Sequence, residues 1–274
     1  MDHRKIKVLI LGSDDFFTAR SIRNLVNNGN LEVRGLIISS PTLGQSNIFG
    51  TLVRLYRRSG SHYVLFQILQ KGLLPILLRL ARECDILLPS KLLKQTGTCV
   101  YRSKSLSGQA LYELASQITP DLIVSSRFTK IIGPERLKIP RYGCINIHKS
   151  NLPSYRGIAP LFSALKNEEK KEVGVTAHLM EEGIHTGLIL VQQRIPIEKD
   201  HTVFSLTIKC AKIASSLVEN AVAGLIAGKI TPVSQLSKGS YYPWPAKRDV
   251  REFSMDNKFF WHWKDLRRIR WLRD

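Results

Sequence analysis

The stretch C-I-N-I-H-K-S-N-L-P-S-Y-R-G-I-A-P, residues 144–160, decides the fold around which the rest of the chain is arranged. Its first residues alternate around β-favouring isoleucines, which predicts a strand with Asn146 and His148 on one face. The prolines and the glycine that follow exclude a helix and predict a rigid loop. An amide and an imidazole beside such a loop could polarise a carbonyl and move protons. The alternative is a buried polar pair that the backbone satisfies.

The N-terminal residues predict a β–α–β unit. Residues 5–11, K-I-K-V-L-I-L, have the pattern of a buried parallel strand that ends at Gly12 and Ser13. Asp14 is placed to cap the helix that follows, and residues 31–39 supply a second strand. The turn does not complete a G-x-G-x-x-G pattern, so the sequence does not support a dinucleotide site.

Strand and helix patterns continue to alternate through most of the chain, which is typical of a sheet covered by helices. The predicted fold class is therefore α/β, with a Rossmann-like, mostly parallel sheet flanked by helices. The further strands are expected at residues 121–126, 173–180 and 188–197, and the further helices at residues 108–116, 161–170 and 203–227.

The order N-x-H-x-S-x-L-P-x-Y-R-G-x-A-P resembles the signature of the folate-dependent formyltransferases, which include methionyl-tRNA, glycinamide ribonucleotide and sugar N-formyltransferases. The resemblance covers roughly residues 5–254 and is weaker over residues 42–107. It implies a Rossmann-like formyltransferase fold and formyl transfer from 10-formyltetrahydrofolate to an amine. It also implies that Asn146 donates to the oxyanion, and that His148 does the same or handles the proton.

The resemblance implies a third catalytic position, and this chain departs from the family there. The family carries an Asp on a turn of the form acidic–Gly–apolar–Asp–Thr–Gly. The corresponding turn here reads E-E-G-I-H-T-G, and His185 takes the Asp position. A carboxylate beside His148 would favour the imidazolium, whereas a second imidazole cannot supply negative charge. Glu181 and Glu182 are the nearest acidic substitutes.

The resemblance also implies where the two substrates bind. Gly12 and Ser13 are expected to help hold the acceptor, and no metal ligands are predicted. For Lys130 the alternative is a solvated surface charge. The residues implied for the folate pocket are Phe128, Thr129, Lys130, Ile131, Ile132, Glu181, Glu182 and Gly183.

The chain is strongly basic. Its 274 residues include 41 Lys and Arg against 22 Asp and Glu, a net charge of +19. Such a charge attracts polyanions, which could be RNA, an acidic membrane face or phosphorylated substrates. The four cysteines lack C-x-x-C spacing and the N-terminus lacks a secretory signal pattern, so a reducing cytoplasmic location is expected.

Two segments lie outside the clear resemblance. We divide the chain into a domain over residues 1–254, with a helical insert at about 42–107, and a basic aromatic tail over residues 255–274. Residues 51–82 have the pattern of amphipathic helices, and residues 258–274 that of a tail helix rich in Trp and Arg. Each is either packed on the domain or an interfacial membrane element.

The favoured function is formyl transfer to a small-molecule amine, with an amino sugar on a nucleotide or lipid carrier preferred as acceptor. Initiator tRNA is less favoured because the tail is too short for an appended tRNA-binding domain. Peripheral association with an anionic membrane, at its inner face, follows from the interfacial interpretation of the two segments. The alternatives are hydrolysis of formyltetrahydrofolate and a catalytically inactive relative that binds folate or a polyanion.

Overall fold

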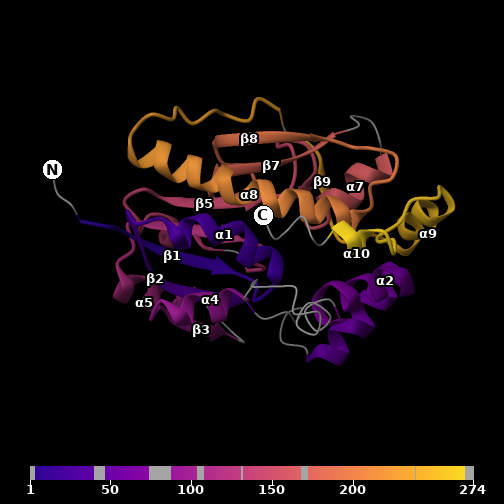
Figure 1. The fold of residues 1–274 in the computed structure, drawn as a ribbon, viewed down its shortest axis with the longest axis horizontal. Coiled ribbons are helices and arrows are strands. Elements are labelled where there is room, and N and C mark those ends of the chain that lie inside the picture. Colours follow the sequence, from indigo (N-terminus) through magenta and orange to yellow (C-terminus); the bar gives the residue numbers. More distant parts are fainter. Residues whose placement is uncertain are drawn as a thin grey trace.

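A seven-stranded sheet forms the centre of the computed structural model, which describes residues 4–39, 47–73, 88–103, 108–130, 132–167, 172–237 and 239–268. The strand order is β3-β2-β1-β4-β5-β7-β8 (Figure 1), with the first five strands parallel and the last two antiparallel to their neighbours. This topology confirms the Rossmann-like, mostly parallel α/β fold. The strands are β1 (Ile6–Gly12), β2 (Leu31–Ser39), β3 (Cys99–Ser103), β4 (Leu122–Ser126), β5 (Cys144–His148), β7 (Glu172–Leu179) and β8 (Ile189–Pro196).

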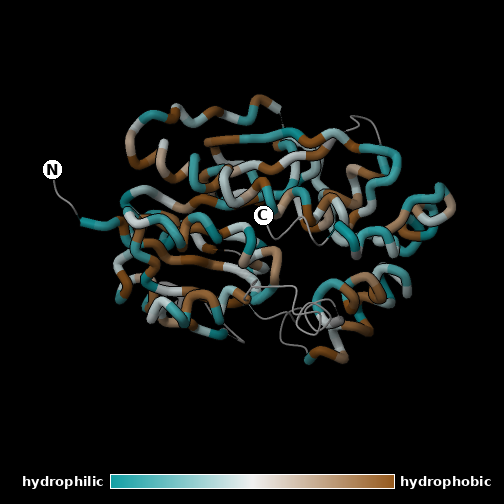
Figure 2. The backbone as a smooth tube through the Cα atoms, viewed as in Figure 1, coloured by the Kyte–Doolittle hydropathy of each residue, from teal (hydrophilic) through white to brown (hydrophobic). Residues whose placement is uncertain are grey.

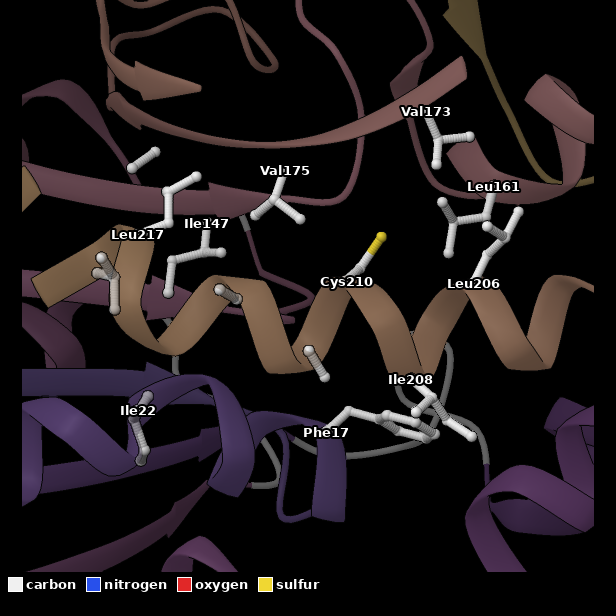
Figure 3. Close-up of a cluster of buried hydrophobic side chains, with 14 of the residues drawn as sticks. Phe17, Ile22, Ile147, Leu161, Val173, Val175, Leu206, Ile208, Cys210 and Leu217 are labelled. Atoms are coloured by element: carbon white, nitrogen blue, oxygen red, sulfur yellow. The ribbon is translucent and has the colours of Figure 1, made fainter. Parts of the chain in front are cut away.

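Helices cover both faces of the sheet. On one face, α1 (Phe16–Asn27) and α8 (Val203–Ile226) lie side by side and are joined by a 2.8 Å hydrogen bond from Asn24 Nδ2 to Glu219 Oε2. The long apolar side of α8 packs onto the strands, as the cluster of buried side chains in Figure 3 shows. On the other face, Ala115 of α5 (Gly108–Ile118) is buried against the sheet. Both faces therefore contain hydrophobic core.

The cap of α1 differs from the sequence prediction by one residue. The N-cap is Asp15, whose Oδ1 accepts a 2.9 Å hydrogen bond from the Thr18 amide. Asp14 instead accepts from the amide of Ser90, at 3.1 Å, and so holds the start of α4 (Pro89–Gln95). Either carboxylate has the chemistry of a cap, and only the tertiary contact with α4 distinguishes them.

The insert packs on the domain where it is described. The amphipathic pattern over residues 65–73 is helical, in α2 (Ile48–Ile68) and η1 (Leu69–Leu73), and residues 74–82 of the predicted helices lie outside the described residues. The insert range also contains β3, an edge strand that the sequence did not predict. Among the helices in the described ranges, none is long and apolar enough to span a bilayer.

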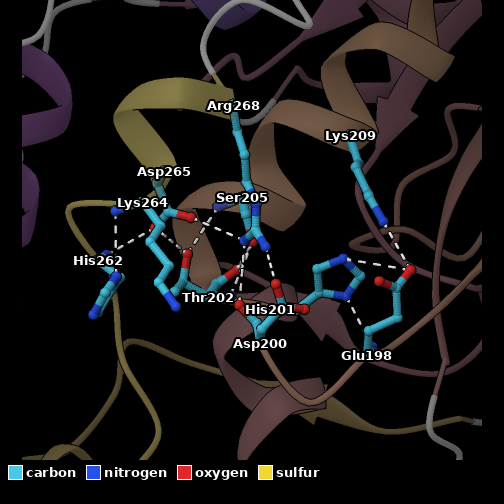
Figure 4. A network of polar contacts seen from close by, with 10 residues as sticks. All are labelled: Glu198, Asp200, His201, Thr202, Ser205, Lys209, His262, Lys264, Asp265 and Arg268. Carbon is cyan, nitrogen blue, oxygen red and sulfur yellow. Dashed lines mark hydrogen bonds and ion pairs between the residues drawn. The ribbon is translucent and has the colours of Figure 1, made fainter.

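The tail docks on the domain through turns and irregular backbone rather than as one helix, and its only described helix is α10 (Asp265–Arg268). The carbonyls of Phe259 and Phe260 accept hydrogen bonds from the first amides of α8, at 3.2 and 2.9 Å. The opening amides of a helix lack intrahelical acceptors, so these carbonyls complete the start of α8. Asp265, 1% exposed, accepts a 2.7 Å bond from the Thr202 hydroxyl in the network of Figure 4.

One aromatic side chain joins the tail, the insert and the core. Phe260 stacks on Phe162 with ring centroids 5.4 Å apart and also contacts Phe66 of α2 at 5.2 Å. Figure 2 shows the contrast between the hydrophobic residues of the central strands and the mostly hydrophilic residues of α9 (Lys247–Met255), the last helix before this segment. The short elements that complete the described fold are α6 (Pro134–Leu137), β6 (Arg156–Gly157), α7 (Pro160–Asn167) and β9 (Tyr241–Tyr242).

Candidate active site

Strand β5 presents Asn146 toward its antiparallel neighbour β7. Asn146 pairs in register with His178, and the Asn146 Nδ2 atom lies 3.1 Å from His178 Nε2. The other ring nitrogen of His178 donates to the Leu179 carbonyl at 2.7 Å, so Nε2 of the neutral ring is an acceptor. The amide nitrogen of Asn146 must therefore face His178. Its second hydrogen can be donated to a reacting carbonyl oxygen.

His148 stands at the end of the same strand and is buried. Its Nε2 lies 3.1 Å from the Tyr155 carbonyl and must be the donor, because a carbonyl only accepts. Nδ1 is then the acceptor of the neutral imidazole. Burial, followed by the neighbouring His185 and His178, holds the pKa of His148 well below its ordinary value of 6.5. The ring is therefore neutral and basic at Nδ1 at physiological pH.

His185 stacks on His148. The two ring centroids are 3.7 Å apart and the planes are inclined by 27°. The Gly157 amide donates to His185 Nδ1 at 3.2 Å, so the neutral ring carries its hydrogen on Nε2. Burial, with contributions from His178 and Arg156, lowers the pKa of His185 to about 3. The three imidazoles thus form a neutral cluster, since burial also lowers the pKa of His178 to about 4.

Backbone conformation fixes the loop and the turn that meet at this stack. Gly157 has φ +105°, and a Cβ on it would lie 2.1 Å from the Tyr242 carbonyl oxygen. A Cβ on Gly187 would lie 1.9 Å from the Leu179 carbonyl oxygen. His185 itself has φ +57°, a region in which His, Asn and Asp are enriched among non-glycine residues. The family's Asp and this chain's His therefore both suit this backbone.

The predicted folate-pocket residues separate into two groups. Phe128 and Ile132 pack against the core on the α5 face, and Lys130 is half-buried. Glu181, Glu182 and the other turn and loop residues of the set are exposed, except for Ile131, which lies outside the described residues. Neither glutamate forms an ion pair with a described residue, so the structure gives them no contact that replaces the family's Asp. The exposed carboxylates on the turn can still bind the polar part of a ligand.

The predicted acceptor turn ties the ends of two strands together. The Ser13 hydroxyl donates to the Arg127 carbonyl at 2.7 Å, and Gly12 lies beside Ser126 in the sheet. These residues follow β1 and β4, whose carboxyl ends meet at the edge of the sheet where open α/β folds bind ligands. Within the described ranges, no group of three or more His, Cys, Asp or Glu residues is arranged to hold a metal ion.

Lys149 lies at the same edge, and the sequence prediction did not include it. Its Nζ is fully buried and has no hydrogen-bond partner among the described residues, although the residue as a whole keeps some exposure. Nζ lies 5.0 Å from the centroid of the Phe17 ring, and the Arg127 guanidinium lies 5.3 Å from the same ring. Alternation along β5 places residue 149 on the core face with Ile147, a signal the sequence already contained.

The pKa of Lys149 is far below its ordinary value. Burial, together with the nearby Arg127 charge, lowers the pKa of Lys149 from 10.5 to about 7. Asp15 acts in the opposite direction, but its carboxylate already accepts a 2.9 Å hydrogen bond from Arg127 Nε. Lys149 is therefore a buried amine that titrates near neutral pH beside the predicted acceptor turn.

Comparison with known proteins places this site in a family. The family profile described as Formyl transferase matches residues 5–222. A methionyl-tRNA formyltransferase from Synechococcus sp. (strain JA-3-3Ab) is 39% identical over 135 residues, which cover 49% of this chain and 42% of that relative. One from Dictyoglomus thermophilum is 36% identical over 165 residues, 59% of this chain and 53% of that relative. The matched part thus spans about half the length of these relatives.

Solved structures agree on the fold. Glycinamide ribonucleotide transformylase 1 from Symbiobacterium toebii superposes with a TM-score of 0.59 at 16% identity, covering 85% of this chain and 96% of that one. The N-formyltransferase from Helicobacter canadensis, solved with folinic acid and dTDP-3-aminofucose, gives 0.57 at 20% identity, covering 87% and 71%. The profile match extends over most of the chain and contains Asn146, His148 and His185. The chain therefore belongs to the formyl transferase family.

Proposed function

We propose that this protein transfers a formyl group from 10-formyltetrahydrofolate to an amine. The observation that supports this most directly is the juxtaposition of an Asn146 amide donor with the neutral, stacked His148 and His185 at the end of β5. Folinic acid in a structural neighbour supports a formylfolate as the donor. Phe128, Ile132 and the exposed turn with Glu181 then supply the apolar and polar sides of its site.

Each residue has a distinct part in the proposed reaction. The acceptor amine attacks the formyl carbon, and the carbonyl oxygen becomes an oxyanion to which Asn146 donates its second N–H. The acceptor nitrogen loses a proton to His148 Nδ1, which the Tyr155 contact leaves as an acceptor. The proton passes to the folate nitrogen as the bond from that nitrogen to the formyl carbon breaks. His185 holds the His148 ring in place by stacking.

The direct test is to mix the purified protein with 10-formyltetrahydrofolate and measure release of tetrahydrofolate with and without amines. The amines would include a nucleotide-linked amino sugar, which we propose as the acceptor class, and methionyl-tRNA, the substrate named for the curated relatives. Release that requires an amine supports transfer and identifies the acceptor. Release without any amine would show hydrolysis instead. Binding without release under all conditions would show an inactive relative.

Replacing His185 by Asp should move the acidic limb of the pH–rate profile to higher pH. A carboxylate against the His148 ring stabilises the imidazolium, and an opposite charge at this range shifts a pKa by about 1–3 units. Because the proposed reaction needs the neutral His148 base, the acidic limb of the profile should move upward by a similar amount. The measurement is the pH dependence of kcat for wild type and His185→Asp.

His185→Asn is the matched control for that substitution, because Asn suits the same positive φ and has the same shape as Asp without its charge. The shift should be absent in His185→Asn. An equal shift in both variants would show that loss of the imidazole, rather than gain of a carboxylate, changes the profile.

We also propose peripheral association with an anionic membrane face, which would suit a cytoplasmic protein acting on a lipid-linked acceptor. Near the start of α2, Ile48 is 67% and Phe49 75% exposed, and Trp263 of the tail is 55% exposed. Exposed arginines of α2 accompany them, and α2, α9 and α10 gather at one end of the molecule (Figure 1). Exposed apolar side chains beside basic ones are typical of interfacial binding.

Vesicle co-sedimentation tests this association. Wild type should pellet with anionic vesicles at low salt and less at higher salt, since the screening length falls from about 30 Å at 0.01 M to about 10 Å at 0.1 M. Phe49→Ser with Trp263→Ser should reduce pelleting, and Leu236→Ser, which removes a 97% exposed side chain outside α2 and the tail, should not. Equal recovery with anionic and neutral vesicles would contradict the proposal. Deleting the tail is a poor test because it would also remove Phe260 from the core.

A further inference from the structure

Residues from three segments of the chain close a ring of hydrogen bonds that includes His185. The Gly157 amide donates to His185 Nδ1 at 3.2 Å. The His185 carbonyl accepts from Gln235 Nε2 at 3.0 Å, and Gln235 Oε1 accepts from Arg156 Nη2 at 2.9 Å. Arg156 precedes Gly157 in the chain, which closes the ring. Gln235 belongs to the segment after α8, beyond the part of the chain that the family profile matches.

The amide of Gln235 acts as a clamp on the turn. Its Nε2 donates to the Gly187 carbonyl at 2.7 Å as well as to the His185 carbonyl, so both of its hydrogens are used. The side-chain oxygen faces the Arg156 guanidinium, which fixes which way round the amide lies. One side chain therefore holds the turn at two carbonyls and ties it to the rigid loop.

The segment that carries Gln235 is itself anchored. Val233 pairs with Ile189 of β8, with backbone hydrogen bonds of 2.8 and 2.9 Å in the two directions. On the other side, the Ser240 carbonyl accepts from the Arg156 amide at 2.8 Å. Gln235 thus approaches the turn from a backbone that is hydrogen-bonded on both sides of it, at Val233 and at Ser240.

The ring of hydrogen bonds determines which tautomer the His185 imidazole adopts. With Nδ1 accepting from Gly157, the hydrogen of the neutral imidazole lies on Nε2. The carbonyl and the imidazole belong to the same residue, so the contact of Gln235 with the His185 carbonyl constrains the position from which the imidazole stacks on His148, with ring centroids 3.7 Å apart. The stack and the tautomer therefore depend on the carbonyl that Gln235 holds.

We propose that Gln235 is a positioning residue for formyl transfer, which fixes His185 as a neutral Nε2–H imidazole stacked on His148 through the ring with Arg156 and Gly157. This inference rests on the proposed function for its kinetic consequences. The tautomer of His185 and the position of its imidazole do not depend on turnover. The hydrogen bonds of Gln235 go to the turn and to Arg156, and it acts through the turn.

The experiment compares Gln235→Met and Gln235→Glu with wild type by 15N NMR of the His185 ring. Met has a similar length without donors, and Glu keeps an acceptor for Arg156 while losing the two N–H donors. Wild type should show the Nε2–H tautomer and no titration near neutral pH, with His148, His178 and Arg156 as the neighbours that oppose its charge. Gln235→Met should populate both tautomers and titrate closer to the reference value of about 6.5.

Kinetics supply the second measurement. Gln235→Met should lower kcat by about 10- to 100-fold, the scale for a misplaced catalytic group, with KM for the formyl donor within about twofold. Gln235→Glu should be worse than Gln235→Met, because a carboxylate oxygen would face two carbonyls. In a His185→Asn background, Gln235→Met should have little further effect. Gln193→Met, an exposed glutamine on β8, is the control.

An unchanged His185 tautomer and titration in Gln235→Met would overturn the proposal. So would a loss of kcat of the same size with and without the His185 side chain, since that would indicate a general structural effect. If wild type transfers no formyl group, the NMR result alone decides the inference. An absence of formyl transfer and an unchanged His185 tautomer in Gln235→Met are therefore separate results.

Discussion

Asn146→Ala should lower kcat by about 100- to 1,000-fold, the cost of removing one preorganised oxyanion donor. The His178 contact holds the Asn146 amide with one hydrogen engaged and the other available, so the donor is oriented before the substrate arrives. Binding of the formyl donor should change little, because the interaction develops only as the carbonyl oxygen gains charge. Single-turnover kinetics and equilibrium binding of the donor measure the two quantities separately.

Asn24→Ala is the control for that experiment, since Asn24 also uses its amide in a hydrogen bond but joins α1 to α8. It should retain turnover. Asn146→Ala also leaves His178 Nε2 without its donor, so unfolding must be followed to show that the variant is folded at the assay temperature. Near-normal kcat in a folded Asn146→Ala protein would exclude the oxyanion role.

Lys149→Met should raise the free energy of unfolding by about 4 kcal/mol at pH 7. The pKa of Lys149 falls from 10.5 to about 7 on folding, and each pKa unit corresponds to about 1.4 kcal/mol. Met fills a similar volume beside Phe17 and has no charge to bury. The measurement is chemical denaturation of both proteins at pH 7, with Lys199→Met as an exposed control.

The pH dependence of the free energy of unfolding tests the burial of the Lys149 amine independently. Because the folded pKa is depressed, the unfolded chain binds more protons between about pH 7 and 10.5, and the stability of wild type should rise across that interval. Between pH 7 and 9 the rise from this group should be about 2 kcal/mol, and it should be missing in Lys149→Met. Parallel stability curves for the two proteins would show that the amine is not buried as described.

The sequence predicted most strands of the sheet because each depends on local order, and the resemblance to the family indicated that His185 takes a position near His148. Alternation along residues 144–148 defines β5, and the glycines of the loop and turn need their residue type at those positions. Gln235 could not be predicted in the same way. Its role depends on two carbonyls that are 48 and 50 residues away, and no local pattern marks it.

In the tail, a clear local pattern predicted a helix that tertiary contacts override. Residues 258–264 have a helical pattern of aromatic and basic side chains, but they form no helix in the structure. The carbonyls of Phe259 and Phe260 instead accept hydrogen bonds from the amides at the start of α8, a long-range contact that local propensity does not predict. Lys149 illustrates a third case, in which alternation placed a charged residue on the core face and only the packing shows that its Nζ is buried without a hydrogen-bond partner among the described residues.

The docking of the tail has a consequence for how the protein is made. The Thr202 hydroxyl and the Asp265 carboxylate are 63 residues apart, and the helix that covers the sheet acquires its first hydrogen-bond acceptors from residues near that carboxylate. On the ribosome, nearly the whole domain emerges before those residues do, and long-range contacts form late. The start of α8 therefore lacks these acceptors until synthesis has passed Phe260, and a nascent chain that stalls before Phe260 leaves the aromatic cluster incomplete.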